Sequence, residues 1–129
     1  MATTLTEKLQ LKPGQRMLVQ NPPVGCFEHL IVELPQAGLE VEGADALLLF
    51  VGSLAEMAEL APGAIKMVGQ NGLLWITYPK GGSGVKTDVN RDRLAAAVLD
   101  ATGWRAVRQV AIDEVWSALR FRPVELVGK

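Results

Sequence analysis

The chain has 129 residues, of which 49% are hydrophobic, 21% are charged and 5% are aromatic. This length fits one domain and excludes a two-domain enzyme, while the composition excludes a disordered, collagen-like or disulfide-stapled protein. Thirteen Lys and Arg residues against fourteen Asp and Glu residues give a net charge of -1, so the charge of the whole chain does not favour nucleic acid or an anionic membrane as a partner.

The sequence predicts a cytoplasmic protein with a single domain, residues 1–129. Its one cysteine, Cys26, cannot form an internal disulfide and suits a reducing compartment. Residues 1–11 lack the continuous apolar run of a secretory signal. The longest apolar run, 46–51, is far shorter than the roughly 20 residues that span a bilayer.

The first third of the chain predicts a helical turn, a strand and a helix. The turn, residues 6–10, stops before Pro13, because the residue before a proline avoids the helical conformation. Residues 16–20 predict a buried strand, which ends at a rigid Asn-Pro-Pro turn. Apolar residues at helical spacing then predict a short amphipathic helix that ends near Pro35. Residues 39–43 lie too close to the next strand for a parallel crossover and predict a lead-in or a short edge element.

The middle of the chain predicts two strongly buried strands with a helix between them. Residues 46–51 are apolar without alternation, which is typical of a central parallel strand, and residues 73–78 predict the second strand. Ser53 with Glu56 forms a capping-box pattern that starts the helix. Pro62 predicts a break or kink in this helix.

The last third predicts a helix followed by an antiparallel hairpin. The helix covers residues 89–102 and has Gly103 as its C-cap. Two β-rich runs, 105–112 and 115–122, form the hairpin and are joined at Asp113-Glu114. The order of these elements therefore predicts an α/β fold with a mostly parallel sheet and one reversed strand.

Several segments resemble class I S-adenosylmethionine-dependent methyltransferases. Residues 9–19 are similar to the approach to the first strand of those enzymes, residues 44–50 to their fourth strand, and residues 67–77 to the turn into their fifth. The closing hairpin resembles their reversed last strand. The resemblance covers most of the chain and implies a fold of class α/β, a shortened Rossmann-like (methyltransferase-like) three-layer sandwich. Its sheet would have five or six strands, mostly parallel, with a C-terminal antiparallel hairpin.

The loop after the first strand departs from the methyltransferase pattern. Those enzymes have a glycine-rich loop there, because a backbone without side chains lets the cofactor approach closely. Residues 20–26 keep one of these glycines, Gly25, and Val19 stands at the acidic position of the strand. No acidic residue after a second strand is recognised. S-adenosylmethionine is therefore not an expected cofactor.

A second resemblance is to a small uncharacterised bacterial family, known as a domain of unknown function. It rests on residues 78–92, Tyr-Pro-Lys-Gly-Gly-Ser-Gly-Val-Lys-Thr-Asp-Val-Asn-Arg-Asp, and on residues 111–121. The family implies no established activity.

The loop between the second buried strand and the next helix predicts an anion site. It leaves the carboxyl end of a central strand, where open α/β sheets bind ligands, and it combines glycines, cations and hydroxyl groups with a helix N-terminus. The candidate residues are Lys80, Ser83, Lys86, Thr87, Asn90 and Arg91. The alternative is a solvated loop in which Thr87 or Asp88 caps the helix. Val85 stands where a P-loop needs its second glycine, so this loop is not a P-loop.

The hairpin holds a secondary candidate cluster of Asp113, Trp116 and Arg120. Trp116, Ala118 and Arg120 share one face of the strand, and Ser117 lies on the other. Trp116 and Arg120 could offer a flat surface beside a charge. The favoured interpretation places Asp113 in the turn and Trp116 against the sheet, and an Asp113–Arg120 pair is the alternative.

Cys26 and His29 are three residues apart on the first long helix. A thiol at a helix N-terminus can have a lowered pKa, although a small buried thiol is the commoner outcome. One cysteine and one histidine cannot form a structural zinc site, so no metal is expected. Nor does the sequence show the basic stripe interleaved with aromatics that binds nucleic acid.

Three classes of function remain open. The leading hypothesis is a non-catalytic methyltransferase-like domain that binds a small anionic molecule at the loop 80–91. The second is an enzyme, either a reduced methyltransferase or one that uses Cys26 or the lysines. The third is an interaction module in which the strand edge or the hairpin forms a homodimer.

Overall fold

The computed structural model describes residues 4–40, 43–68, 72–80 and 87–126. Its sheet has six strands in the order β2-β1-β3-β4-β6-β5. These are β1 (Met17–Gln20), β2 (Ala37–Gly38), β3 (Ala46–Phe50), β4 (Leu73–Pro79), β5 (Trp104–Ala111) and β6 (Trp116–Pro123). The first four run parallel, and β6 is antiparallel to both of its neighbours, β4 and β5. The prediction of a mostly parallel sheet with one reversed strand is confirmed.

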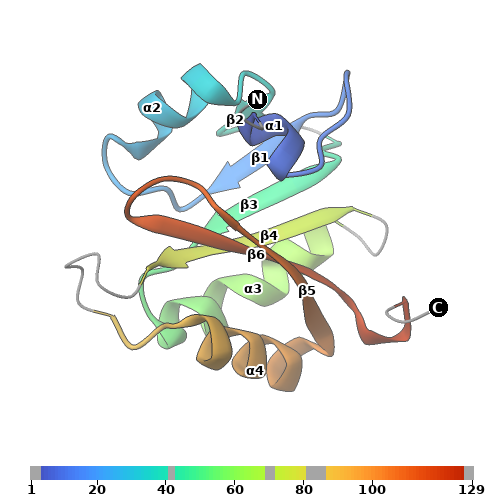
Figure 1. Cartoon of the computed structure of the whole chain (residues 1–129). Coiled ribbons are helices and arrows are strands. Elements are labelled where there is room, and N and C mark those ends of the chain that lie inside the picture. The colour runs from blue at the N-terminus through green and yellow to red at the C-terminus, as the bar shows by residue number, and fades with distance from the viewer. Residues whose placement is uncertain (1–3, 41–42, 69–71, 81–86, 127–129) are drawn as a thin grey trace.

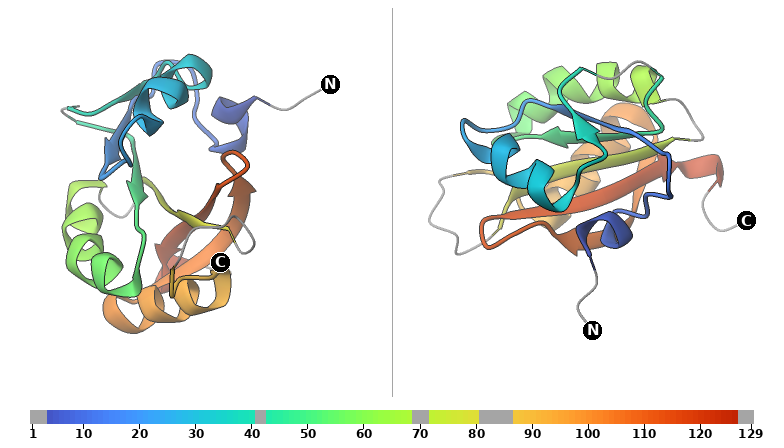
Figure 2. Two further views of the ribbon diagram at one scale, coloured as in Figure 1. Left: turned by 90° about the vertical axis from the view of Figure 1, so that its left-hand side faces the viewer. Right: turned by 90° about the horizontal axis from the view of Figure 1, so that it is seen from above.

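Helices cover both faces of the sheet (Figures 1 and 2). The short α1 (Leu5–Lys8) and α2 (Cys26–Glu33) lie on one face, and α3 (Leu54–Val68) and α4 (Arg91–Thr102) lie on the other. A 3-10 helix, η1 (Val124–Leu126), follows β6. The sheet thus separates two apolar cores, one under α1 and α2 and one under α3 and α4.

Strand β3 explains why the sequence shows an unbroken apolar run. All five of its residues are buried, and its alternate side chains enter opposite cores. Leu47 and Leu49 pack under α3 and α4, whereas Leu48 and Phe50 pack under α1 and α2. A central strand covered by helices on both faces needs apolar residues at every position.

Helix α3 runs without a break from Leu54 to Val68 through Pro62, so the expected break at this proline is wrong. A proline inside a helix costs about 3 kcal/mol. The helix buries residues on both sides of Pro62, namely Met57, Ala61 and Ala64, and this packing favours one continuous helix. Pro62 itself lies on the exposed side.

The other boundaries differ from prediction by a few residues. Helix α4 begins at Arg91 rather than near Val89, because Asn90 is the N-cap, and Gly103 is the C-cap with a φ of 76°. The edge strand β2 precedes residues 39–43 and pairs in parallel with β1, since α2 supplies the crossover between them. The sequence also predicts a turn at Asn71-Gly72 into the second buried strand, and Asn71 lies outside the described residues.

Candidate functional site

A cavity of about 530 Å³, here called the α4 cavity, lies between the start of α4 and strands β4, β6 and β5. Its lining consists of Tyr78, Lys80, Asn90, Arg91, Gln109, Val110, Ala111 and Ser117. Three of these residues, Lys80, Asn90 and Arg91, belong to the anion site that the sequence predicts. The carboxyl end of β4 therefore opens into a cavity, as expected for an open α/β sheet.

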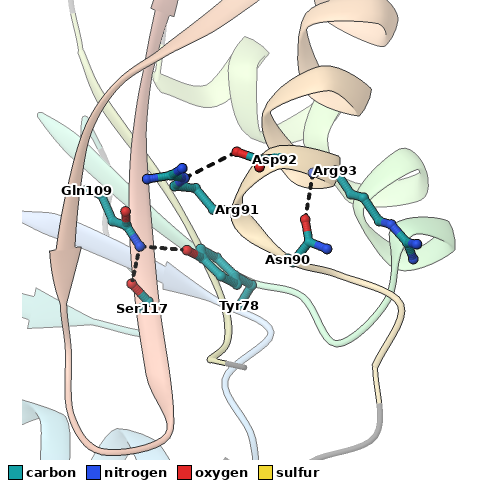
Figure 3. Close-up of polar contacts among 7 residues, drawn as sticks. All are labelled: Tyr78, Asn90, Arg91, Asp92, Arg93, Gln109 and Ser117. Carbon is teal, nitrogen blue, oxygen red and sulfur yellow. Dashed lines mark hydrogen bonds and ion pairs between the residues drawn. The ribbon is translucent and has the colours of Figure 1, made fainter. Parts of the chain in front are cut away.

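Neutral hydrogen-bonding groups form one wall of the α4 cavity (Figure 3). The Gln109 side-chain amide donates to the Tyr78 hydroxyl at 2.9 Å and to the Ser117 hydroxyl at 3.3 Å. The Ser117 hydroxyl in turn donates to the Val110 carbonyl at 3.1 Å. Sequence reasoning missed Tyr78 and Gln109, which lie 31 residues apart, because only the register of β4, β6 and β5 brings them together.

Two cations face these neutral groups. Arg91 extends from the first turn of α4 toward the hairpin, whereas Arg93 points away from it (Figure 3). The Arg91 guanidinium also pairs with the exposed carboxylate of Asp92 at 3.3 Å. The Lys80 ammonium group donates to the backbone carbonyl of Asp113 in the hairpin turn, and an ammonium group has two further N–H donors. Together with the N-terminus of α4, these groups favour a bound anion.

Thr87 and Asp88 hold the chain between β4 and α4 against the start of α3. The Thr87 hydroxyl donates to the Gly52 carbonyl at 2.7 Å and accepts from the Val89 N–H at 3.0 Å. Asp88 accepts from the Leu54 N–H at 2.9 Å. It thus adds to the predicted N-cap of α3, Ser53, whose hydroxyl accepts from the Glu56 N–H at 3.1 Å. Neither Thr87 nor Asp88 caps α4, since Asn90 accepts from the Arg93 N–H at 2.8 Å.

The remaining candidates of the loop are only partly placed. Thr87 is not among the residues that line the α4 cavity, and its hydroxyl is already engaged. Ser83 and Lys86 lie outside the described residues. The structure thus brings together three of the six predicted residues.

The secondary cluster in the hairpin does not form one site. Asp113 lies in the turn and accepts from the N–H groups of Val115 and Trp116, both at 2.8 Å. The Trp116 ring stands edge-on against Phe50, with 5.3 Å between the ring centroids. Arg120 donates to the Gln10 side chain at 2.5 Å, and among the described residues it forms no ion pair with Asp113.

A separate cavity of about 430 Å³, here called the thiol cleft, lies between the start of α2 and the hairpin turn. Cys26, His29 and Glu33 line one side of it, and Asp113 and Trp116 line the other. Burial raises the pKa of the Cys26 thiol, and the charges of Asp113 and Glu28 raise it further. The lowered pKa that a helix N-terminus could give is not found, because burial and the carboxylates outweigh the helix end. The raised pKa agrees with the favoured interpretation of a partly buried thiol.

We expect Cys26 to react with iodoacetamide at pH 8 several-fold more slowly than free glutathione does, because only the thiolate is nucleophilic. The rate can be followed by mass spectrometry of the alkylated protein. Asp113→Asn keeps an acceptor oxygen for the turn but removes a charge that raises the pKa, so it should speed the reaction. A native rate equal to that of the urea-unfolded chain would contradict the raised pKa.

No helix in residues 4–40, 43–68, 72–80 and 87–126 is long and apolar enough to cross a bilayer. The same residues contain no group of three or more His, Cys, Asp or Glu side chains placed to hold a metal ion.

Comparison with known proteins supports the fold. No family model and no curated protein matches the chain, so its membership of the small bacterial family stays a prediction. The solved structure of TnmH matches 87% of this chain at 17% identity with a TM-score of 0.55. RosA, an N,N-8-amino-8-demethyl-D-riboflavin dimethyltransferase from Streptomyces davawensis, matches 87% at 16% identity with a TM-score of 0.50. A protein of the NADB-Rossmann superfamily from Streptococcus agalactiae matches 95% at 10% identity, also with a TM-score of 0.50.

These matches show a Rossmann-like fold of the methyltransferase type. The chain spans 44% of TnmH and 43% of RosA, and 70% of the streptococcal protein. At identities below 25% the shared property is the fold, because one fold hosts many functions.

The residues after β1 do not fit the cofactor of a methyltransferase. Pro22 and Pro23 have no backbone N–H to donate. Asn21, with a φ of 58°, donates its side-chain amide to the Phe50 carbonyl at 2.9 Å, which joins the ends of β1 and β3. Glu40, two positions after β2, is an acidic residue that follows the second strand of the structure. The sequence does not predict this position, because residues 37–38 show no pattern of a strand. A cavity of about 510 Å³, lined in part by Asn21, Pro22 and Leu39, lies beside the loop after β1. The acidic residue is therefore present, but the loop lacks the glycines and backbone donors that the cofactor of a methyltransferase needs.

Proposed function

We propose that the chain is a non-catalytic binding domain of methyltransferase-like fold, and that it takes a small anionic molecule in the α4 cavity. The observation that carries this proposal is the lining of that cavity. Two cations, Lys80 and Arg91, lie opposite the neutral polar side chains of Tyr78, Gln109 and Ser117. Among the described residues that line this cavity, none is acidic.

The ligand class follows from the chemistry of these groups. A guanidinium group can bind a carboxylate or phosphate through two parallel hydrogen bonds, and an ammonium group adds a point charge. Hydroxyl and amide groups on the opposite wall can hydrogen-bond the uncharged part of a metabolite. A phosphorylated or carboxylated metabolite therefore suits the cavity better than an uncharged or cationic one.

A thermal-shift experiment tests this proposal. Phosphorylated and carboxylated metabolites are added one at a time, with glucose as the uncharged control. A ligand at about ten times its Kd stabilises the folded state by about 1.4 kcal/mol, which raises the Tm of a domain of this size by about 5 °C. We expect at least one anion to give such a shift.

Two substitutions on the same turn of α4 give a matched comparison. Arg91→Gln removes a cavity cation and should abolish the shift, as should Lys80→Gln. Arg93→Gln makes the same change of charge two positions away, on a side chain that points away from the cavity, and should keep the shift. The proposal is wrong if no anion stabilises the protein, or if Arg93→Gln acts as strongly as Arg91→Gln.

A further inference from the structure

Four arginines lie together on one face of the β5–β6 hairpin, away from the α4 cavity. Arg105 is directly opposite Arg122 in the antiparallel register, and Arg108 is directly opposite Arg120. Opposed residues of an antiparallel pair share a face, and Arg120 and Arg122 are two residues apart on one strand. This arginine array therefore forms a two-by-two arrangement of guanidinium groups.

A β-bulge creates the arginine array. Arg105 and Arg108 are three positions apart, so in a regular strand their side chains would point to opposite faces. The register shifts between Ala106 and Arg108, and this extra residue brings Arg108 onto the face of Arg105. Bulges re-aim side chains in this way and are common beside functional sites.

The array lies on the α1 side of the sheet. Ala118, which shares this face of β6 with Arg120, belongs to the core under α1 and α2, and Arg120 donates to Gln10, just after α1. Tyr78 and Leu119, by contrast, belong to the core under α3 and α4. The array and the α4 cavity are therefore separate candidate sites on opposite faces.

The arginine array is not neutralised within the described residues. The ion pair found there joins Arg91 and Asp92, so none of the four arginines lies within 4.0 Å of a described carboxylate. The buried Nε of Arg120 has no hydrogen-bond partner. Burial lowers the pKa of Arg120, and the charges of Arg122 and Arg108 lower it further. The native chain thus holds like charges face to face, an arrangement that destabilises a sheet.

Protection of a sheet edge does not account for all four residues. Charged side chains and bulges on an edge strand prevent pairing with other chains, and this could explain Arg105 and Arg108 on β5. Arg120 and Arg122, however, lie on β6, which is paired on both sides. Unfavourable local arrangements without a structural gain are typical of functional sites.

We propose that the arginine array binds a row of phosphate groups, as present in a linear oligophosphate or in the backbone of single-stranded nucleic acid. Each opposed pair can hold one phosphate, with bidentate hydrogen bonds from Arg105, Arg108 or Arg122. Arg120, whose Nε is buried and whose Nη1 donates to Gln10, adds mainly its charge. Along β6 the two pairs are separated by two residues, roughly 6.7 Å at about 3.3–3.4 Å per residue. A ligand with consecutive phosphates can reach both pairs. The net charge of -1 does not reveal this site, because it averages over the whole chain.

Two probes test the proposal and distinguish the two sources of phosphate. Sodium tripolyphosphate is titrated by calorimetry, and a fluorescein-labelled oligouridylate of twelve nucleotides is titrated by fluorescence anisotropy, both at 50 mM salt. If the nucleic acid binds, its log K should fall with log salt with a slope of about -1.4 to -2.8, for two to four neutralised phosphates. Binding of both probes, or of either one alone, supports the phosphate row and identifies its source. Binding of neither overturns the proposal.

Charge-matched variants separate the array from general electrostatics. Arg105→Gln/Arg108→Gln changes exposed side chains and should weaken binding at least tenfold. For the nucleic acid it should also reduce the salt slope by about 1.4. Lys66→Gln/Arg93→Gln removes the same two charges from α3 and α4 and should leave affinity within twofold. An equal loss of affinity in both double variants would overturn the proposal. The proposal would also be overturned if affinity fell only in Lys80→Gln/Arg91→Gln, because the phosphate would then bind in the α4 cavity.

Thermal stability supplies a second readout. Removing one member of an opposed like-charge pair should leave the Tm of Arg105→Gln/Arg108→Gln unchanged or raise it. Loss of binding without loss of stability would identify a ligand-binding role. A large fall in Tm together with intact binding would show that the arginines are structural and would overturn the proposal.

Discussion

Replacement of Trp75 by alanine is expected to lower the free energy of unfolding by about 3–5 kcal/mol, the range found for large aromatic side chains in cores. Trp75 is fully buried in the middle of β4, and its indole N–H donates to the Leu9 carbonyl at 3.2 Å. The substitution leaves a cavity under α1 and an unpaired carbonyl. Urea denaturation followed by far-ultraviolet circular dichroism measures the loss, which is a large fraction of the roughly 5–15 kcal/mol of a typical domain.

Two further variants separate the contributions of Trp75. Trp75→Phe keeps much of the apolar volume but removes the donor to Leu9, so it should cost about 1–3 kcal/mol. Leu99→Ala on α4 removes a side chain that is 42% exposed and should change stability by less than about 1 kcal/mol. A loss below 1 kcal/mol for Trp75→Ala would show that α1 is not held on the sheet through this residue. The segment after α1 would then not position Gln10 against Arg120.

The fold is well predicted where burial dictates the sequence. Residues 46–51 and 73–78 predict β3 and β4 almost to the residue, because a strand covered on both faces consists almost entirely of apolar residues. The edge strand β2 has two residues, too few for any periodic pattern. Helix α3 continues through Pro62 because it packs against the sheet. Helix propensity depends on the local sequence only, so it does not predict this effect of packing.

The candidate site is predicted only where its residues are close in sequence. Lys80, Asn90 and Arg91 follow from the rule that ligands gather at the carboxyl ends of parallel strands. Tyr78 and Gln109 meet across β6, so their contact requires the register of three strands. The arginine array depends on a bulge between Ala106 and Arg108, and no sequence motif predicts this bulge. Without the bulge, a count of alternating positions assigns Arg105 and Arg108 to opposite faces.

The Asn21-Pro22-Pro23 turn after β1 joins the ends of two strands. The sequence predicts a rigid turn at Asn21-Pro22-Pro23, and the structure shows why Asn stands first. Asn21 adopts a left-handed conformation with a φ of 58°, which Asn tolerates better than most residues do. Its amide reaches the Phe50 carbonyl at the end of β3. The switch point between β1 and β3, where an open sheet would bind a cofactor, is thus bridged by the chain itself.

Asn21→Ala should therefore destabilise the protein by about 2 kcal/mol. It loses a hydrogen bond worth about 0.5–1.5 kcal/mol and forces alanine into the left-handed region, at a cost of roughly 1 kcal/mol. Asn21→Gly loses the same hydrogen bond but accepts the positive φ, so its loss should be about 1 kcal/mol smaller. Urea denaturation of both variants measures the two contributions separately. Equal stability of Asn21→Ala and the natural chain would mean that the amide is solvated and that the edge between β1 and β3 is open. A loss in Asn21→Ala that Asn21→Gly fully restores would assign the whole effect to the backbone, and the bridge to Phe50 would then contribute nothing to closing this edge.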